Sequence, residues 1–158
     1  MIRKEMRESP AWRAAPDNLR RLLDRLEVEH MRHAGTQNGK LAVTYDDFAE
    51  WGVRRASVAL TIRQGLALGF LEVTRKGYKS AAEFRVPSLY RLTYVWGRKP
   101  GSREAEEPTD EWRRLDEDGA ANALREAATS RDIDRRRAGA SGEPATSGAL
   151  PRLGYSRT

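Results

Sequence analysis

Residues 53–73 read VRRASVALTIRQGLALGFLEV, and this stretch decides the fold that we expect. Val53 precedes a polar turn, after which apolar residues recur at positions i, i+4 and i+8 of one helical face: Val58, Ile62 and Leu66. Gly69 follows the last periodic residue, where glycine commonly ends a helix. The next residues, FLEVT at 70–74, have the aromatic and β-branched composition of a strand. The stretch therefore predicts a helix over 54–68 that leads directly into a strand.

The N-terminal part of the chain predicts two helices. Ser9 and Pro10 are an N-cap followed by proline at the first helical position, and they begin a short helix that Trp12 anchors. A longer helix begins at Pro16 and ends before the turn signals at 35–39. One side of this helix carries an apolar to amphipathic stripe, which consists of Leu19, Leu22, Leu23, Leu26, His30 and His33.

Shorter elements complete the expected pattern. LAVTY at 41–45 is typical of a short strand. Two acidic residues at 46–47 favour the first turn of a short helix, and Gly52 ends that helix. LYRLTYVW at 89–96 predicts a strand that pairs antiparallel with 70–74 through a long basic connection.

The composition changes at Lys99, which we take as the end of a domain over 1–98. Proline and glycine break regular structure in 99–108, so this segment is expected to be a linker. A helix is expected over 109–129, with a threonine cap and acidic residues in its first turn. Residues 130–158 are rich in Ser, Gly, Ala and Arg and offer little to bury, so they predict a disordered tail.

Positive charge is concentrated in one part of this 158-residue chain, whose net charge is +6. Residues 54–98 carry nine basic and two acidic side chains, whereas residues 1–53 are neutral and residues 99–158 carry one net negative charge. A concentrated basic segment favours a polyanionic partner, because neutralising phosphates releases condensed counterions. A solvated surface that only keeps the protein soluble is the simpler alternative.

The order of these elements is that of a winged helix, a helix-turn-helix extended by a β-hairpin. Residues 53–73 resemble the recognition-helix-to-wing segment of MarR-like proteins and of plasmid and phage replication initiators. AEFRVPSLYRLTY at 82–94 is similar to the wing return of small helix-turn-helix proteins on alphaproteobacterial mobile elements. The resemblance covers about residues 9–96. It implies an α+β winged helix-turn-helix, here with a C-terminal helix and a disordered tail.

The implied function is non-enzymatic binding of double-stranded DNA, in transcriptional regulation or as an accessory to replication or maintenance of a plasmid, prophage or integrated element. Small, polar and basic side chains at the start of a recognition helix suit the major groove, where Arg and Gln read guanine and adenine. In the helix these candidate DNA contacts are Arg54, Arg55, Ser57, Thr61 and Gln64. In the wing they are Arg75, Lys76, Lys79 and Arg85.

Other functions have weaker support in the sequence. We find no catalytic motif and expect neither an enzyme nor a cofactor. Glu27, His30 and His33 are legitimate metal ligands, but both histidines continue the leucine stripe, so we expect no metal site. The absence of cysteine excludes disulfides and thiolate zinc sites. Without an apolar run of about 20 residues or a signal peptide, we expect a cytoplasmic protein that is not in a membrane.

A protein-interaction module is the alternative function. In that case the winged helix is a scaffold, and the C-terminal segment recruits a protein partner through LPRLGYSRT at 150–158. The sequence also leaves open a homodimer, because Leu60 contacts either a thymine methyl group of DNA or a second copy of the chain.

Overall fold

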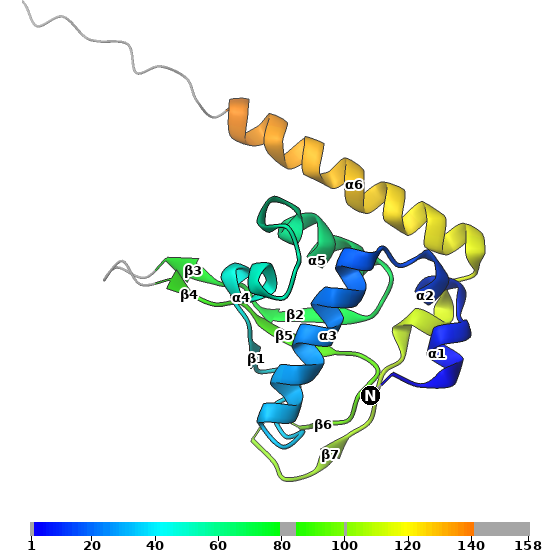
Figure 1. Ribbon diagram of the computed structural model, residues 1–158, viewed down its shortest axis with the longest axis vertical. Helices are drawn as coiled ribbons and strands as arrows, with labels where there is room; N and C mark the ends of the chain where they lie inside the picture. Colours follow the sequence, from blue (N-terminus) through cyan, green and yellow to red (C-terminus); the bar gives the residue numbers. More distant parts are fainter. Residues whose placement is uncertain (1, 80–84, 100, 141–158) are drawn as a thin grey trace, which may run out of the picture.

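The computed structural model describes residues 2–79, 85–99 and 101–140, with side chains described as far as Thr129. It has the mixed α+β composition that the sequence predicts. In Figure 1, α3 crosses in front of a small central sheet, and the long C-terminal helix α6 lies across the top of the molecule, next to α5 and α2.

The N-terminal region contains three helices, α1 (Lys4–Glu8), α2 (Pro10–Ala14) and α3 (Asp17–Arg32). The two predicted helices are confirmed, and α1 is an addition. The Ser9 hydroxyl accepts a hydrogen bond from the backbone N–H of Trp12, which is the expected cap. The predicted stripe of α3 is buried at its four leucines.

Strand β1 (Leu41–Ala42) leads into helix α4 (Tyr45–Glu50). Thr44 and Asp47 form a capping box, in which each side chain accepts a hydrogen bond from the other residue's backbone N–H. Gly52 has a φ of +86°, a left-handed conformation that glycine adopts without strain. The predicted short helix and its glycine stop are therefore confirmed, and Val53 is buried after them.

The helix expected over 54–68 consists of a 3-10 turn, η1 (Arg55–Ser57), followed by α5 (Val58–Ala67). The predicted buried face is wrong at Leu66, which is 41% exposed. Leu66 lies about 80° around the helix from Val58, which puts it at the edge of the buried face. The residues of α5 that are buried instead are Val58, Thr61, Ile62 and Gly65.

A three-stranded antiparallel sheet has the order β1-β5-β2. β2 (Leu71–Arg75) pairs with β5 (Leu89–Leu92) as the sequence predicts, although β5 ends four residues early. Between them, β3 (Tyr78–Lys79) and β4 (Arg85–Val86) form a short antiparallel ladder that projects from the sheet in Figure 1.

The segment after Lys99 differs from the expected linker and helix. β6 (Gly97–Arg98) and β7 (Ala105–Glu106) form a hairpin across most of the segment expected to be a linker. A 3-10 turn, η2 (Glu111–Arg114), precedes α6 (Glu117–Ala140). The helix begins late because Asp110 adopts a left-handed conformation with φ +48°, and helices are not built from such residues.

Residues 130–140 are helical, so the disorder expected from residue 130 is not observed in this part of the chain. Alanine and arginine are good helix formers and make up most of residues 135–140, which lets the helix continue without an apolar face. The rest of the expected tail lies outside the described residues.

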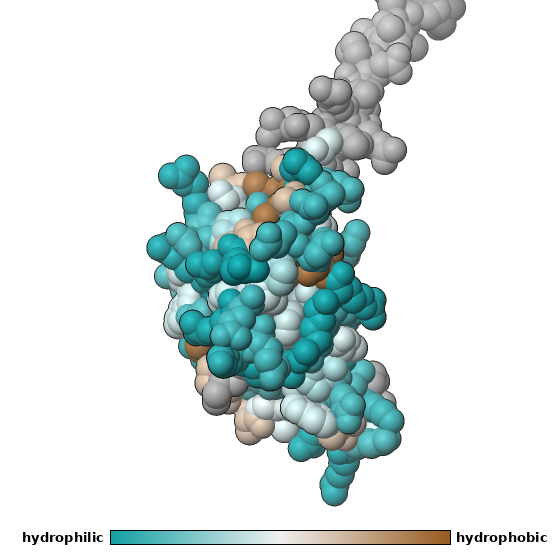
Figure 2. Space-filling model, turned by 90° about the vertical axis from the view of Figure 1, so that its right-hand side faces the viewer, coloured by the Kyte–Doolittle hydropathy of each residue, from teal (hydrophilic) through white to brown (hydrophobic). Residues whose placement is uncertain are grey.

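One core joins the N-terminal helices, the sheet and the C-terminal segment. Phe70 packs edge-on against both Trp12 and Tyr94, with ring centroids 5.7 and 6.5 Å apart. Trp112 and Ala120 belong to the same buried cluster. Figure 2 shows that the face on the side of α1 and α2 is mainly hydrophilic, with scattered apolar spots. Within the described ranges, none of the helices has both the length and the apolar composition needed to cross a bilayer.

Candidate nucleic-acid interface

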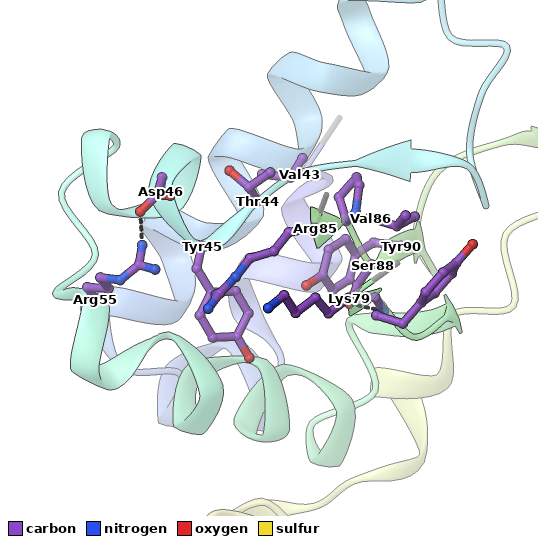
Figure 3. Close-up of a pocket in the computed structure, with 13 residues that line it drawn as sticks. Val43, Thr44, Tyr45, Asp46, Arg55, Lys79, Arg85, Val86, Ser88 and Tyr90 are labelled. Carbon is purple, nitrogen blue, oxygen red and sulfur yellow. Dashed lines mark hydrogen bonds and ion pairs between the residues drawn. The ribbon is translucent and has the colours of Figure 1, made fainter. Parts of the chain in front are cut away.

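A pocket of about 400 Å³ lies between the β3–β4 hairpin and the start of α4. Three of the candidate DNA contacts meet at this pocket: Arg55, Lys79 and Arg85. Arg55 comes from η1, and Lys79 and Arg85 come from the two strands of the hairpin. The hairpin follows η1 by more than twenty residues in the chain. Figure 3 shows Lys79 and Arg85 pointing toward Tyr45. The fold therefore gathers charge from the predicted recognition segment and the predicted wing at one place.

Arg54 and Arg55 are both exposed where the chain enters α5. The Arg55 guanidinium forms an ion pair with the Asp46 carboxylate in the first turn of α4, as Figure 3 shows. The side chains of the two partners are 51% and 76% exposed, so water screens this pair strongly. Arg55 can therefore exchange the Asp46 carboxylate for another anion at a small cost in free energy.

The candidate DNA contacts at Ser57, Thr61 and Gln64 differ in their exposure to solvent. Thr61 is 1% exposed, and its hydroxyl donates a hydrogen bond of 2.9 Å to the Ser57 carbonyl. The sequence prediction that Thr61 contacts DNA is therefore wrong, because its side chain faces the core. Ser57 and Gln64 are half-buried and lie outside the pocket.

The basic residues of the predicted wing are exposed. Arg75 ends β2, Lys76 follows it, and Lys79 and Arg85 occupy directly opposite positions of the β3–β4 ladder. These two residues thus bring two positive charges to neighbouring positions of the hairpin. The loop between these strands, residues 80–84, lies outside the described residues.

Two tyrosines shape the pocket, and the sequence analysis assigned neither of them to a site. Tyr45 is 40% exposed at the N-terminus of α4. Tyr90 is buried in β5, and burial raises its pKa to about 12, so its hydroxyl stays protonated at neutral pH. The pattern LAVTY suggested only a strand, and no local signal in the sequence brings residue 45 next to the wing.

Helix α6 packs along one side of α5. The Arg63 guanidinium Nε donates a hydrogen bond of 3.1 Å to the backbone carbonyl of Ala127. Ala127 itself is 6% exposed, so this part of α6 is in close contact with the body of the protein. Helix α6 thus covers part of α5, although the sequence analysis placed it in a separate segment.

Two of the three residues considered as metal ligands have other partners. Glu27 accepts a hydrogen bond of 2.9 Å from the Tyr94 hydroxyl, and His33 lies 3.2 Å from Glu29. Burial lowers the pKa of His30, which favours its neutral form. Within the described part of the chain, no cluster of three or more histidine, aspartate or glutamate side chains is placed to hold a metal ion.

Comparison of the chain with protein-family models, with curated proteins and with solved structures gives no match.

Proposed function

We propose that this protein binds double-stranded DNA through a winged helix-turn-helix, with α5 as the recognition helix and β3–β4 as the wing. The observation that carries the proposal is the gathering of Arg55, Lys79 and Arg85 around one concave surface. These residues belong to the segment 54–98, which carries the +7 charge. A surface of this kind attracts phosphates, and the release of counterions supplies free energy for binding.

The topology supports the same proposal. A winged helix places a short strand between its first two helices and a hairpin after the third, and α3, β1, α4, α5, β2 and β5 follow this order. Arg55, just before α5, and the β3–β4 hairpin line the same pocket, as a recognition helix and a wing that bind one duplex would require. Arg54 and Gln64 are then the candidates for base contacts, and Arg75, Lys76, Lys79 and Arg85 for phosphate contacts.

Fluorescence anisotropy with labelled duplexes tests this proposal. Affinity should fall with salt, with a log–log slope of about 0.9 for each phosphate contacted. Lys76→Gln should weaken binding to all sequences equally and reduce that slope by about one. The matched control is Arg13→Gln, which removes one exposed cation from α2, far from the wing in Figure 1. A full chain that binds no duplex at low salt contradicts the proposal.

Base reading is tested separately from phosphate binding. Gln64→Ala should cost about 1–3 kcal/mol on the preferred sequence and little on others if Gln64 reads an adenine. Asp46→Asn should strengthen duplex binding, because it removes a negative charge and frees Arg55. Glu50→Gln is the control for this charge change, since Glu50 is also exposed on α4 and lies outside the pocket.

The proposed role is that of a transcriptional regulator, or of an accessory to the replication or maintenance of a mobile element. The alternative, a protein-interaction module, is favoured by exposed apolar side chains at Leu66 and Trp96, which are 41% and 55% exposed. Replacing both by serine should leave duplex affinity unchanged under the first proposal.

A further inference from the structure

The pocket beside the wing has the features of a small-ligand site as well as those of a DNA-facing surface. Its volume of about 400 Å³ lies within the usual range for such sites. Its apolar part is formed by Val43, Val86, Pro87 and the ring of Tyr90. A phosphate backbone alone makes no use of an apolar wall, so the pocket suits a ligand that has a flat apolar part in addition to charge.

Tyr45 offers a surface on which such a flat group can stack. Its ring is 40% exposed and stands at the pocket, where Lys79 and Arg85 extend toward it (Figure 3). Stacking between an aromatic side chain and a nucleobase contributes binding energy whatever the base, because every base has a π-face. An aromatic ring with two cations beside it is complementary to a base that carries a phosphate.

The charges that line the pocket favour an anionic ligand. Arg55 is paired with Asp46, so these two residues contribute no net charge. Arg85 is exposed in β4, opposite Lys79 in the β3–β4 ladder, and its guanidinium brings positive charge to the pocket. The Tyr90 phenol, with its pKa raised by burial, adds no negative charge that would repel the ligand.

We propose that this pocket binds a mononucleotide, with its base stacked on Tyr45 and its phosphate held by Arg85 and Lys79. The nucleotide is either a free molecule or an unpaired nucleotide of a DNA strand, since both present the same chemistry. The site goes beyond duplex binding, although it shares Arg55, Lys79 and Arg85 with the proposed interface. A bound free nucleotide therefore competes with duplex DNA for the wing.

Isothermal titration calorimetry of the full chain with adenosine 5′-monophosphate is the test. We expect saturable binding, and at least tenfold weaker binding of adenosine, of ribose 5-phosphate and of inorganic phosphate. A single-stranded oligonucleotide distinguishes the sources. If the free nucleotide binds, it is itself a ligand; if only the oligonucleotide binds, with the same dependence on Tyr45, the ligand is an unpaired nucleotide of DNA.

Variants decide whether the pocket is the site. Tyr45→Leu and Arg85→Gln should each weaken binding at least tenfold, whereas Tyr45→Phe should keep it. Trp96→Leu and Arg114→Gln are the controls, because they change an exposed aromatic and an exposed cation outside both the pocket and the proposed DNA interface. If Tyr45→Leu fails to fold by circular dichroism, Arg85→Gln on the exposed hairpin decides alone.

Absence of saturable binding of both the nucleotide and the oligonucleotide overturns the proposal, as does binding that Tyr45→Leu and Arg85→Gln leave unchanged. Duplex affinity measured on the same samples separates the two proposals. A protein that binds the mononucleotide but no duplex overturns only the proposed function. A protein that binds a duplex, but neither the nucleotide nor the oligonucleotide, overturns only this inference.

Discussion

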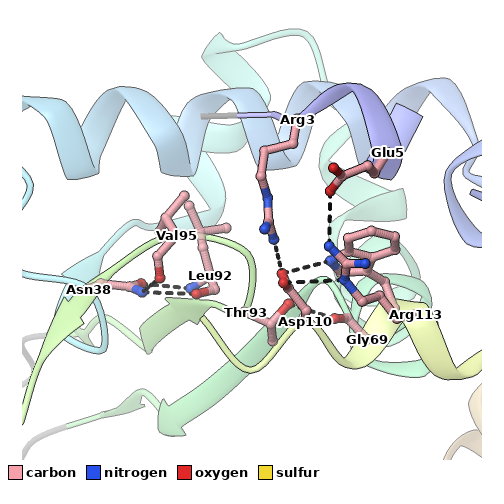
Figure 4. A network of polar contacts seen from close by, with 10 residues as sticks. Arg3, Glu5, Asn38, Gly69, Leu92, Thr93, Val95, Asp110 and Arg113 are labelled. Atoms are coloured by element: carbon pink, nitrogen blue, oxygen red, sulfur yellow. Dashed lines mark hydrogen bonds and ion pairs between the residues drawn. The ribbon is translucent and has the colours of Figure 1, made fainter. Parts of the chain in front are cut away.

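Asp110 makes hydrogen bonds that connect the C-terminal segment to the rest of the protein. Its carboxylate accepts hydrogen bonds from the Arg3 guanidinium, from the indole N–H of Trp112 at 3.1 Å and from Arg113 at 3.4 Å (Figure 4). Its backbone N–H donates to the Thr93 carbonyl at 3.0 Å. Through its side chain and its backbone, this one residue therefore joins the N-terminal region, the end of β5 and η2.

We expect Asp110→Ala to lower the free energy of unfolding by about 1–3 kcal/mol, because the indole N–H of buried Trp112 loses its charged acceptor and Arg3 loses its ion pair. Asp110→Asn should cost less, since asparagine also tolerates the left-handed conformation and still accepts a hydrogen bond. Chemical denaturation measures the difference. The exposed control Glu104→Ala removes only a surface pair with Lys99 and should change stability little; an equal loss there would contradict the assignment.

The stability of the folded protein should depend on pH through three carboxylates, those of Glu29, Asp47 and Asp110. Burial alone would raise the pKa of each, but hydrogen bonds outweigh it: from Arg25 and His33 for Glu29, from Thr44 for Asp47, and from Arg3 and Trp112 for Asp110. Each pKa is therefore lowered in the folded state. Groups of this kind stabilise the protein above their unfolded pKa of about 4, and this contribution is lost as the pH falls through the folded pKa.

The melting temperature should consequently fall steeply below about pH 4. Neutral His30 adds a smaller loss below about pH 6.5, because its pKa is lowered by burial and the unfolded state takes up the proton first. Glu29→Gln should lower the melting temperature at pH 7, and its difference from the unmodified protein should narrow toward pH 3. The exposed control Glu126→Gln should follow the unmodified profile throughout.

At the scale of the elements, two glycines determine how α5 packs. A Cβ at Gly65 would lie 2.6 Å from Leu71 Cδ2 and 3.0 Å from Leu19 Cδ1, so this glycine lets α5 approach both β2 and α3. A Cβ at Gly69 would lie 2.8 Å from the backbone nitrogen of Trp112. Gly69 thus ends α5, as the sequence predicts, and also admits η2 against the helix.

Gly65→Ala should destabilise the protein by about 1–3 kcal/mol through overpacking, although alanine is favoured over glycine within a helix by about 1 kcal/mol. The comparison variant is Gly119→Ala in α6, where the new methyl group meets mainly the movable carboxylate of Asp116. Thermal unfolding of both variants compares the two sites. A Gly65→Ala protein as stable as the unmodified chain would show that α5 can shift to make room.

The end of β5 is another feature of the elements that the sequence pattern did not predict. The Asn38 amide donates to the carbonyls of Leu92 and Val95 at 2.9 and 3.1 Å and accepts from the Leu92 N–H at 2.7 Å (Figure 4). These bonds hold the turn that follows Leu92, so the run LYRLTYVW is a strand only in its first half. A contact across 54 residues decided this boundary.

For the whole molecule, the C-terminal segment belongs to the same core as the N-terminal helices. Trp112 is 3% exposed and Ala120 is fully buried, and the Arg13 guanidinium on α2 pairs with Glu117 on α6 at 2.9 Å. The composition change at Lys99 marks a change in charge and in turn-forming residues. It does not mark the end of the packed core.

A chain shortened to residues 1–129 should therefore keep nearly the melting temperature of the full protein. A chain shortened to residues 1–99 should melt more than about 10 °C lower, because it loses the burial of Trp112 and the helix that covers α5. Differential scanning calorimetry of the three chains measures this. Equal melting temperatures for 1–99 and the full chain would mean that the segment after Lys99 contributes little to the core.

Local patterns in the sequence were sufficient for the α+β class, for most helices and for the pairing of β2 with β5, because caps, glycine stops and apolar periodicity act between near neighbours in the chain. Long-range packing decided the rest. It turned Thr61 into the core, exposed Leu66, placed α6 along α5 and brought Tyr45 beside the β3–β4 hairpin. The concentration of charge in 54–98 was visible in the sequence, but the pocket where Arg55, Lys79 and Arg85 meet depends on how the sheet and α4 are placed in three dimensions.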